Sequence, residues 1–288
     1  MTRAVASFAF AAAVTLAAPQ EHFAKVDNNL RVRYLTEGNG AMTMVLVHGW
    51  TCSAAFWRLQ SADFARVYRV ISIDLPGHGK SDKPANVQYS IPLFASAVDA
   101  VMRDAQVTRA IIAGHSLGVP VAAQGIVDHP ERFAGFIAVD GAVWRPRAVD
   151  APQVQKPRNG LTFAQRLRAD YVGTASANLD SMFVPATPPD LRDEIRERML
   201  MTPVHVAASA SENIGASDVW MRAPLTLPTM AVVSGKQKDD DRRALYEEYF
   251  PGLRFELWEE AGHFLMMEQP ARFNQLVMEW AFKIANAK

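Results

Sequence analysis

The 288-residue sequence lacks the features that would define a disulfide-rich, nucleic-acid-binding or membrane-spanning protein. Its single cysteine, Cys52, excludes an intrachain disulfide and any Cys-rich metal site, and is expected to be a small apolar core residue. Thirty Lys and Arg residues balance thirty Asp and Glu residues, so no nucleic-acid partner is expected. Beyond the N-terminus no run of 18 consecutive apolar residues occurs, so we expect no stable membrane insertion.

The N-terminus has the pattern of an export signal. Arg3 supplies a positive charge, residues 4–16 are largely apolar, and small residues surround Leu16 at a plausible cleavage point. The sequence therefore predicts a signal peptide over residues 1–17, a mature start near Ala18, and export to the periplasm or the extracellular space. A retained amphipathic or buried N-terminal helix is the alternative.

The mature chain has the composition and pattern of a large α/β domain, with 49% apolar and 21% charged residues. Alternating residues over 22–36 predict an antiparallel hairpin. Continuous apolar runs at 42–47 and 68–73 predict strands buried on both faces, as in a parallel sheet covered by helices. The segments 54–67 and 91–105 carry apolar residues at helical spacing, so the order is β-α-β-α.

The second half continues this alternation after one interruption. From Trp144 to about Pro224 there are helical patterns and prolines but no buried-strand runs, which indicates an insertion. No internal repeat or low-complexity tract occurs. The remaining predicted core elements are strands near 110–113, 133–139, 229–234 and 253–258, and helices over about 118–128, 241–250 and 270–285.

The motif Gly114-His115-Ser116-Leu117-Gly118 directly follows the apolar run 110–113. A strand that reverses sharply into a helix strains the residue at the corner, and glycines two positions before and after it remove the Cβ atoms that would collide. Ser116 is therefore predicted to project alone at the N-terminus of a helix, whose N–H groups and dipole would stabilise an anion formed there.

Four motifs in order resemble a serine hydrolase of the α/β-hydrolase family, of the kind with a helical cap. They are 48–50 (HGW), 74–81 (DLPGHGKS), 114–118 (GHSLG) and 262–264 (GHF). The resemblance covers nearly all of the chain after the signal. It implies an α/β-hydrolase fold: a mostly parallel sheet with an N-terminal antiparallel hairpin, a core formed by residues 18–143 and 225–288, and a helical cap over 144–224.

The resemblance also assigns roles to individual residues. It makes Ser116 the nucleophile and His263, on a loop after the last strand, the base that takes its proton. The backbone N–H groups of Trp50 and Leu117 are predicted to bind the oxyanion. His115 should point away from the corner at Ser116. No pair of histidines has a metal-ligand context, so neither metal nor cofactor is expected.

The resemblance also implies a third catalytic residue, an acid that accepts a hydrogen bond from the His263 imidazole. The sequence offers more than one candidate for this acid. In the α/β-hydrolase family, the strand that corresponds to 229–234 is usually followed by a glycine and, three residues later, by the aspartate that serves as this acid. In this sequence Lys238 occupies that position. Asp239, Asp240 or Asp241 could serve if the loop slips by one to three residues, although they also fit helix capping and first-turn charge. We favour Asp140, which directly follows the strand 133–139 and needs no slippage.

The predicted activity is hydrolysis of a carboxylic ester or lactone through an acyl-Ser116 intermediate, on a small hydrophobic substrate held between core and cap. Two alternatives stay open: a receptor-like binding protein with incidental hydrolysis, and a cofactor-free perhydrolase or haloperoxidase. The sequence fixes neither the acyl chain length nor the oligomeric state. Apolar residues that could line the pocket, or pack within the cap instead, are Met182, Phe183, Met199, Met201, Trp220 and Met221, with Met266 and Met267 after His263.

Overall fold

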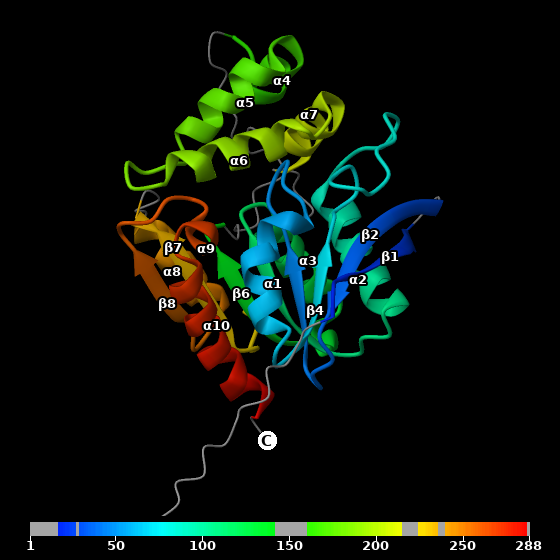
Figure 1. Cartoon of the computed structure of the whole chain (residues 1–288), viewed down its shortest axis with the longest axis vertical. Coiled ribbons are helices and arrows are strands. Elements are labelled where there is room, and N and C mark those ends of the chain that lie inside the picture. Colours follow the sequence, from blue (N-terminus) through cyan, green and yellow to red (C-terminus); the bar gives the residue numbers. More distant parts are fainter. Residues whose placement is uncertain (1–16, 27–28, 142–159, 215–223, 236–239, 287–288) are drawn as a thin grey trace, which may run out of the picture.

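The structure, a computed structural model, describes residues 17–26, 29–141, 160–214, 224–235 and 240–286. Within this part of the chain, eight strands form one sheet in the order β1-β2-β4-β3-β5-β6-β7-β8 (Figure 1). The predicted signal peptide lies outside the described residues except for Ala17. The strands are β1 (Gln20–Val26), β2 (Leu30–Glu37), β3 (Thr43–Val47), β4 (Arg69–Ile73), β5 (Ala110–His115), β6 (Phe133–Val139), β7 (Thr229–Ser234) and β8 (Arg254–Trp258).

The sheet is antiparallel at its N-terminal edge and parallel elsewhere. β1 pairs with β2, and β2 with β4, in antiparallel register, whereas β3 to β8 all pair in parallel. Every residue of β3, β5, β6 and β7 is buried, as the continuous apolar runs predict for strands covered on both faces. The sheet and the cap described below confirm the predicted fold class.

Helices cover both faces of this sheet. Side chains of α2 (Ile91–Asp104), α3 (Gly118–Asp128) and α8 (Asp240–Tyr249) pack with Val45, Ile112 and Ala138 on one face. α1 (Arg58–Phe64), α9 (Leu265–Glu268) and α10 (Pro270–Ala285) pack with their strand neighbours on the other face. These two apolar layers fix the strands, so the loops at their carboxyl ends have a rigid support.

Four helices lie over the carboxyl ends of the parallel strands (Figure 1). They are α4 (Phe163–Ala169), α5 (Tyr171–Asp180), α6 (Pro189–Leu200) and α7 (Val204–Asn213). All four fall within the segment predicted as the cap, and we call these helices, together with the turns that join them, the cap. The side chain of Thr162 accepts a hydrogen bond from Gln165 N–H, and Asp170 accepts one from Gly173 N–H, so both α4 and α5 begin with an N-cap. The helical pattern of the sequence did not reveal α5.

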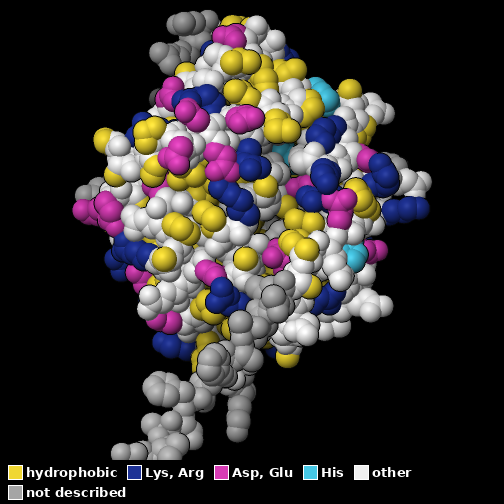
Figure 2. Space-filling view, in the orientation of Figure 1, with side chains coloured by type: hydrophobic (Ala, Val, Ile, Leu, Met, Phe, Trp, Pro, Cys, Tyr) yellow, Lys and Arg dark blue, Asp and Glu magenta, His cyan; other side chains and the backbone are white. Residues whose placement is uncertain are grey.

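Charges of both signs are interspersed on the surface. On the face drawn in Figure 2, Lys and Arg side chains alternate with Asp and Glu, and no broad area of one sign is visible. Large exposed apolar residues are scattered, with Val172 and Met201 on the cap and Phe282 on α10. The face drawn in Figure 2 is consistent with the balanced composition.

Candidate active site

Ser116 stands at the corner between β5 and α3. Its φ angle is 53°, a left-handed conformation that a non-glycine residue rarely adopts. A Cβ atom on Gly114 would lie 2.2 Å from the carbonyl oxygen of Gly118, and one on Gly118 would lie 2.4 Å from that of Val47. Only glycine therefore allows this sharp turn, which leaves Ser116 partly exposed between buried neighbours.

The side chains of His263 and Asp140 meet at the same edge of the sheet. Asp140 directly follows β6, and its carboxylate Oδ2 lies 2.6 Å from His263 Nδ1. The N–H of Ser116 donates to the carbonyl oxygen of Val139 at 2.9 Å, so the corner that carries Ser116 is hydrogen-bonded to the residue before Asp140. The carboxylate accepts from Nδ1–H, which leaves Nε2 of the imidazole as the proton acceptor.

Asp140 is 1% exposed and lies in a polar cradle. The N–H of Ser234 donates to Oδ1 at 2.8 Å, and the hydroxyl of Ser234 lies 3.1 Å from Oδ2. Burial alone would raise the pKa of Asp140, but the hydrogen bonds from His263 and Ser234 outweigh it and keep the pKa below its ordinary value. The side chain of Asp140 is therefore held as an anion beside the imidazole.

The alternative acids lie elsewhere in the chain. Asp239 is outside the described residues, and Asp240 and Asp241 are the first residues of α8. Arg242 is the third residue of α8. Its guanidinium lies 3.9 Å from Asp140 Oδ1 and adds a positive charge near the carboxylate. Of the two candidate positions, Asp140 is the one whose carboxylate the structure places on His263.

The backbone of His263 is fixed from two sides. Its N–H donates to the carbonyl oxygen of Met182 in the cap at 3.0 Å, and its carbonyl oxygen accepts from His115 Nε2 at 2.9 Å. Burial lowers the pKa of His115 to about 3, so this imidazole stays neutral, and donation from Nε2 sets its tautomer. The sequence does not foresee this position of His115, whose ring lies 4.8 Å from that of His263.

Among the described residues, neither the N–H of Leu117 nor that of Trp50 has a hydrogen-bond partner, and a Cβ atom on Gly49, the residue before Trp50, would lie 3.0 Å from Ser116 Cβ. Leu117 begins α3, so its N–H is one of the unpaired donors of a helix N-terminus. Trp50 lies in a tight turn. A hydrogen bond from Cys52 N–H to the carbonyl oxygen of Gly49, at 3.2 Å, closes this turn. These are the two donors that the motifs predict for an oxyanion hole.

The Trp50 side chain is attached to the cap. Its indole N–H donates to the carbonyl oxygen of Ala207 in α7 at 2.9 Å, and its ring packs against Phe163 of α4 at 5.6 Å. Beside it, the hydroxyl of Thr202 donates to the carbonyl oxygen of Thr51 at 3.0 Å. The turn that carries the Trp50 N–H is thus supported by three residues of the cap or its connections.

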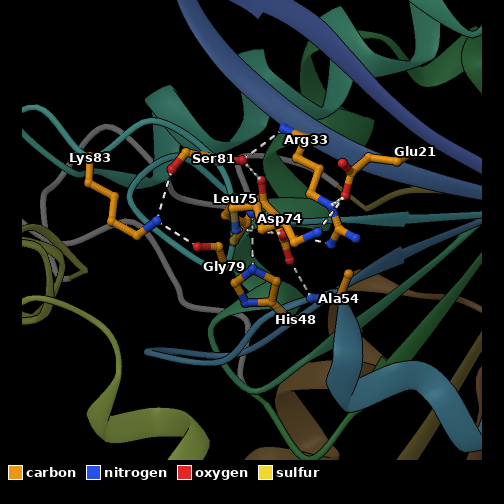
Figure 3. A network of polar contacts seen from close by, with 10 residues as sticks. Glu21, Arg33, His48, Ala54, Asp74, Leu75, Gly79, Ser81 and Lys83 are labelled. Carbon is orange, nitrogen blue, oxygen red and sulfur yellow. Dashed lines mark hydrogen bonds and ion pairs between the residues drawn. The ribbon is translucent and has the colours of Figure 1, made fainter.

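The turn 74–81 is a structural support for this edge of the sheet. The carboxylate of Asp74 accepts from Ala54 N–H and from the guanidinium of Arg33, as Figure 3 shows, and also from Lys80 N–H. The same figure shows Leu75 N–H donating to His48 Nε2 at 3.0 Å. This network holds the start of the turn and the loop after β3, which carries Trp50.

The predicted apolar wall is only partly inside the protein. Phe183 and Met199 are buried against the core, and Met266 and Met267 lie within it. Met201 is 76% exposed, so the expectation that it lines a pocket is wrong: it ends α6 and points to solvent. Trp220 and Met221 lie outside the described residues.

Among the described residues, no cluster of three His, Cys, Asp or Glu side chains could hold a metal ion. No described helix is both long and apolar enough to cross a membrane.

Comparisons with known proteins identify the family of the chain. A model of the alpha/beta hydrolase family matches residues 44–276. A pimeloyl-[acyl-carrier protein] methyl ester esterase of Aeromonas hydrophila is 28% identical over 242 residues, which cover 81% of this chain and 93% of the esterase.

Two solved structures share the fold. A thermophilic esterase from Thermogutta terrifontis superposes with a TM-score of 0.79 and 23% identity, over 92% of this chain and 99% of the esterase. An N-acyl homoserine lactone degrading enzyme superposes with a TM-score of 0.77 and 24% identity, over 90% of this chain and 99% of that enzyme. Since the family model spans most of the sequence and the motifs stand at the matching strand ends, the chain belongs to the alpha/beta hydrolase family.

Proposed function

We propose that this protein is a serine hydrolase that cleaves a carboxylic ester or a lactone through an acyl-Ser116 intermediate. The observation that carries the proposal is the 2.6 Å contact between His263 Nδ1 and a buried Asp140 carboxylate, next to a serine held at φ 53°. A serine hydroxyl is a weak nucleophile until an imidazole accepts its proton. The His263–Asp140 pair fixes the tautomer that can do so.

The reaction follows from these positions. Ser116 Oγ attacks the acyl carbon and its proton passes to His263 Nε2, while the N–H groups of Trp50 and Leu117 bind the oxyanion. Asp140 stabilises the imidazolium that forms. Collapse of the tetrahedral intermediate breaks the bond to the alcohol, which takes the proton from His263, and water then releases the acid from Ser116 by the same steps.

The proposed substrate is a small hydrophobic ester or lactone. A curated relative is named as a methyl ester esterase and a structural neighbour as a lactone-degrading enzyme, which supports both bond types. We propose a hydrophobic substrate because the side chains that the cap supplies at its boundary with the core are apolar, among them Phe183 and Met199.

The test is a fluorophosphonate probe combined with a panel of esters, thioesters and lactones graded by acyl length. Ser116 should be the labelled residue, and Ser116→Ala should lose labelling and lower kcat by at least about 10³-fold. Ser96→Ala is the matched control, because this serine lies on α2 and only donates to the carbonyl oxygen of Leu93. Undiminished turnover by Ser116→Ala would refute the nucleophile, and binding without turnover across the panel would indicate a receptor.

A further inference from the structure

A second carboxylate, that of Glu268, joins the loop of His263 to the cap. One oxygen of Glu268 accepts from the N–H of Gly262, the residue before His263, at 2.6 Å. The other oxygen lies 3.1 Å from the hydroxyl of Thr187, which belongs to the cap segment between α5 and α6. The side chain therefore bridges two segments that are 75 residues apart in the sequence, Thr187 and Gly262.

The core end of this bridge is rigid. Glu268 ends α9, whose preceding residues Leu265, Met266 and Met267 are buried. The N–H of Glu268 donates to the carbonyl oxygen of Phe264 at 2.9 Å, and the buried amide of Gln60 donates to that of Met266 at 2.8 Å. The backbone of Glu268 is thus fixed to the core, and its carboxylate has little freedom to move away from Gly262.

The cap end is organised by Arg192 of α6. Its guanidinium donates to the carbonyl oxygens of Thr187, Val184 and Pro185, and so closes the turn that carries the Thr187 hydroxyl. The same turn presents Phe183, whose ring lies 5.9 Å from that of Phe264, the residue after His263. Polar and apolar contacts therefore reach both neighbours of His263 from the cap.

Gly262 is closely packed on two sides. A Cβ atom at this position would lie 2.5 Å from Glu268 Oε1 and 2.9 Å from the carbonyl oxygen of Met182. The residue before His263 therefore lies directly between the Glu268 carboxylate and the cap backbone. Burial raises the pKa of Glu268, and the two hydrogen bonds partly offset this effect.

We propose that Glu268 is a positioning residue for His263, and that it sets the base by linking Gly262 to Thr187 of the cap. The inference rests on the proposed function, because it gives His263 the role of base. Asp140 orients the imidazole through Nδ1, whereas Glu268 fixes the backbone from which the imidazole projects. Since a displacement of about 1 Å can lower a rate about 10²-fold, this bridge is a determinant of kcat rather than of substrate binding.

The experiment measures kcat and KM of Glu268→Ala, Glu268→Gln, Thr187→Val and Thr187→Ser, with Glu260→Ala as control. Glu268→Ala should lower kcat by about 10²-fold with KM within about threefold of wild type. Glu268→Gln should recover most of this loss, because its amide oxygen can accept from Gly262 and its NH₂ can donate to Thr187 Oγ1. Glu260 is exposed on the same loop and pairs with Arg272 outside the bridge, so its variant should be near wild type.

The cap side provides an independent arm. Thr187→Val removes the hydroxyl at nearly constant volume and should lower kcat. Thr187→Ser keeps the hydroxyl, so its kcat should be near that of wild type. The kcat of the double variant Glu268→Ala/Thr187→Val should lie within about twofold of that of Glu268→Ala, because both substitutions remove the same bridge. Additive effects, or a native kcat in folded Glu268→Ala, would overturn the inference. If Glu268→Ala does not fold, the two Thr187 variants decide.

A spectroscopic readout separates this inference from the proposed function. The downfield proton NMR signal of His263 Nδ1–H reports its hydrogen bond to Asp140 whether or not Ser116 is the nucleophile. It should shift or broaden in Glu268→Ala and return in Glu268→Gln. A wild-type protein that does not react with fluorophosphonate would refute the hydrolase, whereas an unchanged signal in Glu268→Ala would refute the positioning role.

Discussion

Replacing Asp140 by asparagine tests the hydrogen bond that carries the proposed function. The carboxylate now accepts from Ser234 N–H through Oδ1 and from His263 Nδ1 through Oδ2. Asparagine has a single side-chain oxygen, and the backbone N–H of Ser234 will retain it, since that N–H can only donate. The NH₂ group of the asparagine then faces His263 and forces Nδ1 to accept. The imidazole proton moves to Nε2, where it blocks proton transfer from Ser116.

The expected effect is large in catalysis and small in stability. A wrong imidazole tautomer lowers kcat by about 10⁴-fold, which corresponds to about 5 kcal/mol of transition-state stabilisation. The new NH₂ group can donate to the Ser234 hydroxyl, so the free energy of unfolding should change by no more than about 2 kcal/mol. The assays are kcat with the best ester of the panel, the rate of fluorophosphonate labelling, and urea unfolding.

The controls are the aspartates that the sequence offers in place of Asp140. Asp239→Asn, Asp240→Asn and Asp241→Asn should each keep kcat within about threefold of wild type, because the His263 hydrogen bond is already made by Asp140. Near-native activity of Asp140→Asn together with a large loss in one of these three would refute the reasoning. If Asp140→Asn loses activity and also unfolds, the deciding measurement is fluorophosphonate labelling of Ser116 at low temperature.

Two further predictions concern acid stability and export. Burial lowers the pKa of His48 to about 4 and that of His78 to about 3, so only the unfolded chain binds these protons between about pH 6.5 and pH 4. The contribution of these histidines to the free energy of unfolding should be constant above about pH 6.5, and at pH 4 it should be about 3 kcal/mol lower from His48 alone. Urea unfolding at each pH measures this free energy, and a constant value down to about pH 4.5 would contradict the prediction. We also propose that the chain is exported after cleavage near Ala18: mass spectrometry of protein from its native host should find that start, and a cytoplasmic pool beginning at Met1 or Thr2 would show a retained N-terminus.

The sequence was sufficient where the chemistry depends on residues close together in the chain. The glycines around Ser116 predict the strained corner because the close approach involves Gly114 and Gly118 themselves. The continuous apolar strands predict a parallel sheet, and a parallel sheet brings the loops after β6 and β8 to one edge. This topology brings Asp140 close to His263 across 123 positions, whereas the role of His263 as base came from the resemblance to the family.

The sequence was insufficient where a contact depends on how the cap is seated. The carbonyl oxygen of His263 accepts from His115, and its N–H donates to Met182, yet neither contact has a local signature. A methionine in the cap can be lining, cap core or surface, and Met201 proved to be surface because α6 ends there. Glu268 carries no local signature in the sequence, since its partner in the cap is 81 positions away.

The cap of this protein is a structural part of the proposed catalytic site. Its residues donate to the carbonyl oxygen of Thr51, accept from the indole of Trp50, and accept from the N–H of His263. Moving the cap as a rigid body would break these bonds and leave buried polar groups unpaired, at a cost of about 1–3 kcal/mol each. These bonds therefore favour a cap that stays attached to the core in this region. A substitution in α7 that displaces Ala207 should shift the turn of Trp50 as well, and with it one of the two proposed oxyanion donors.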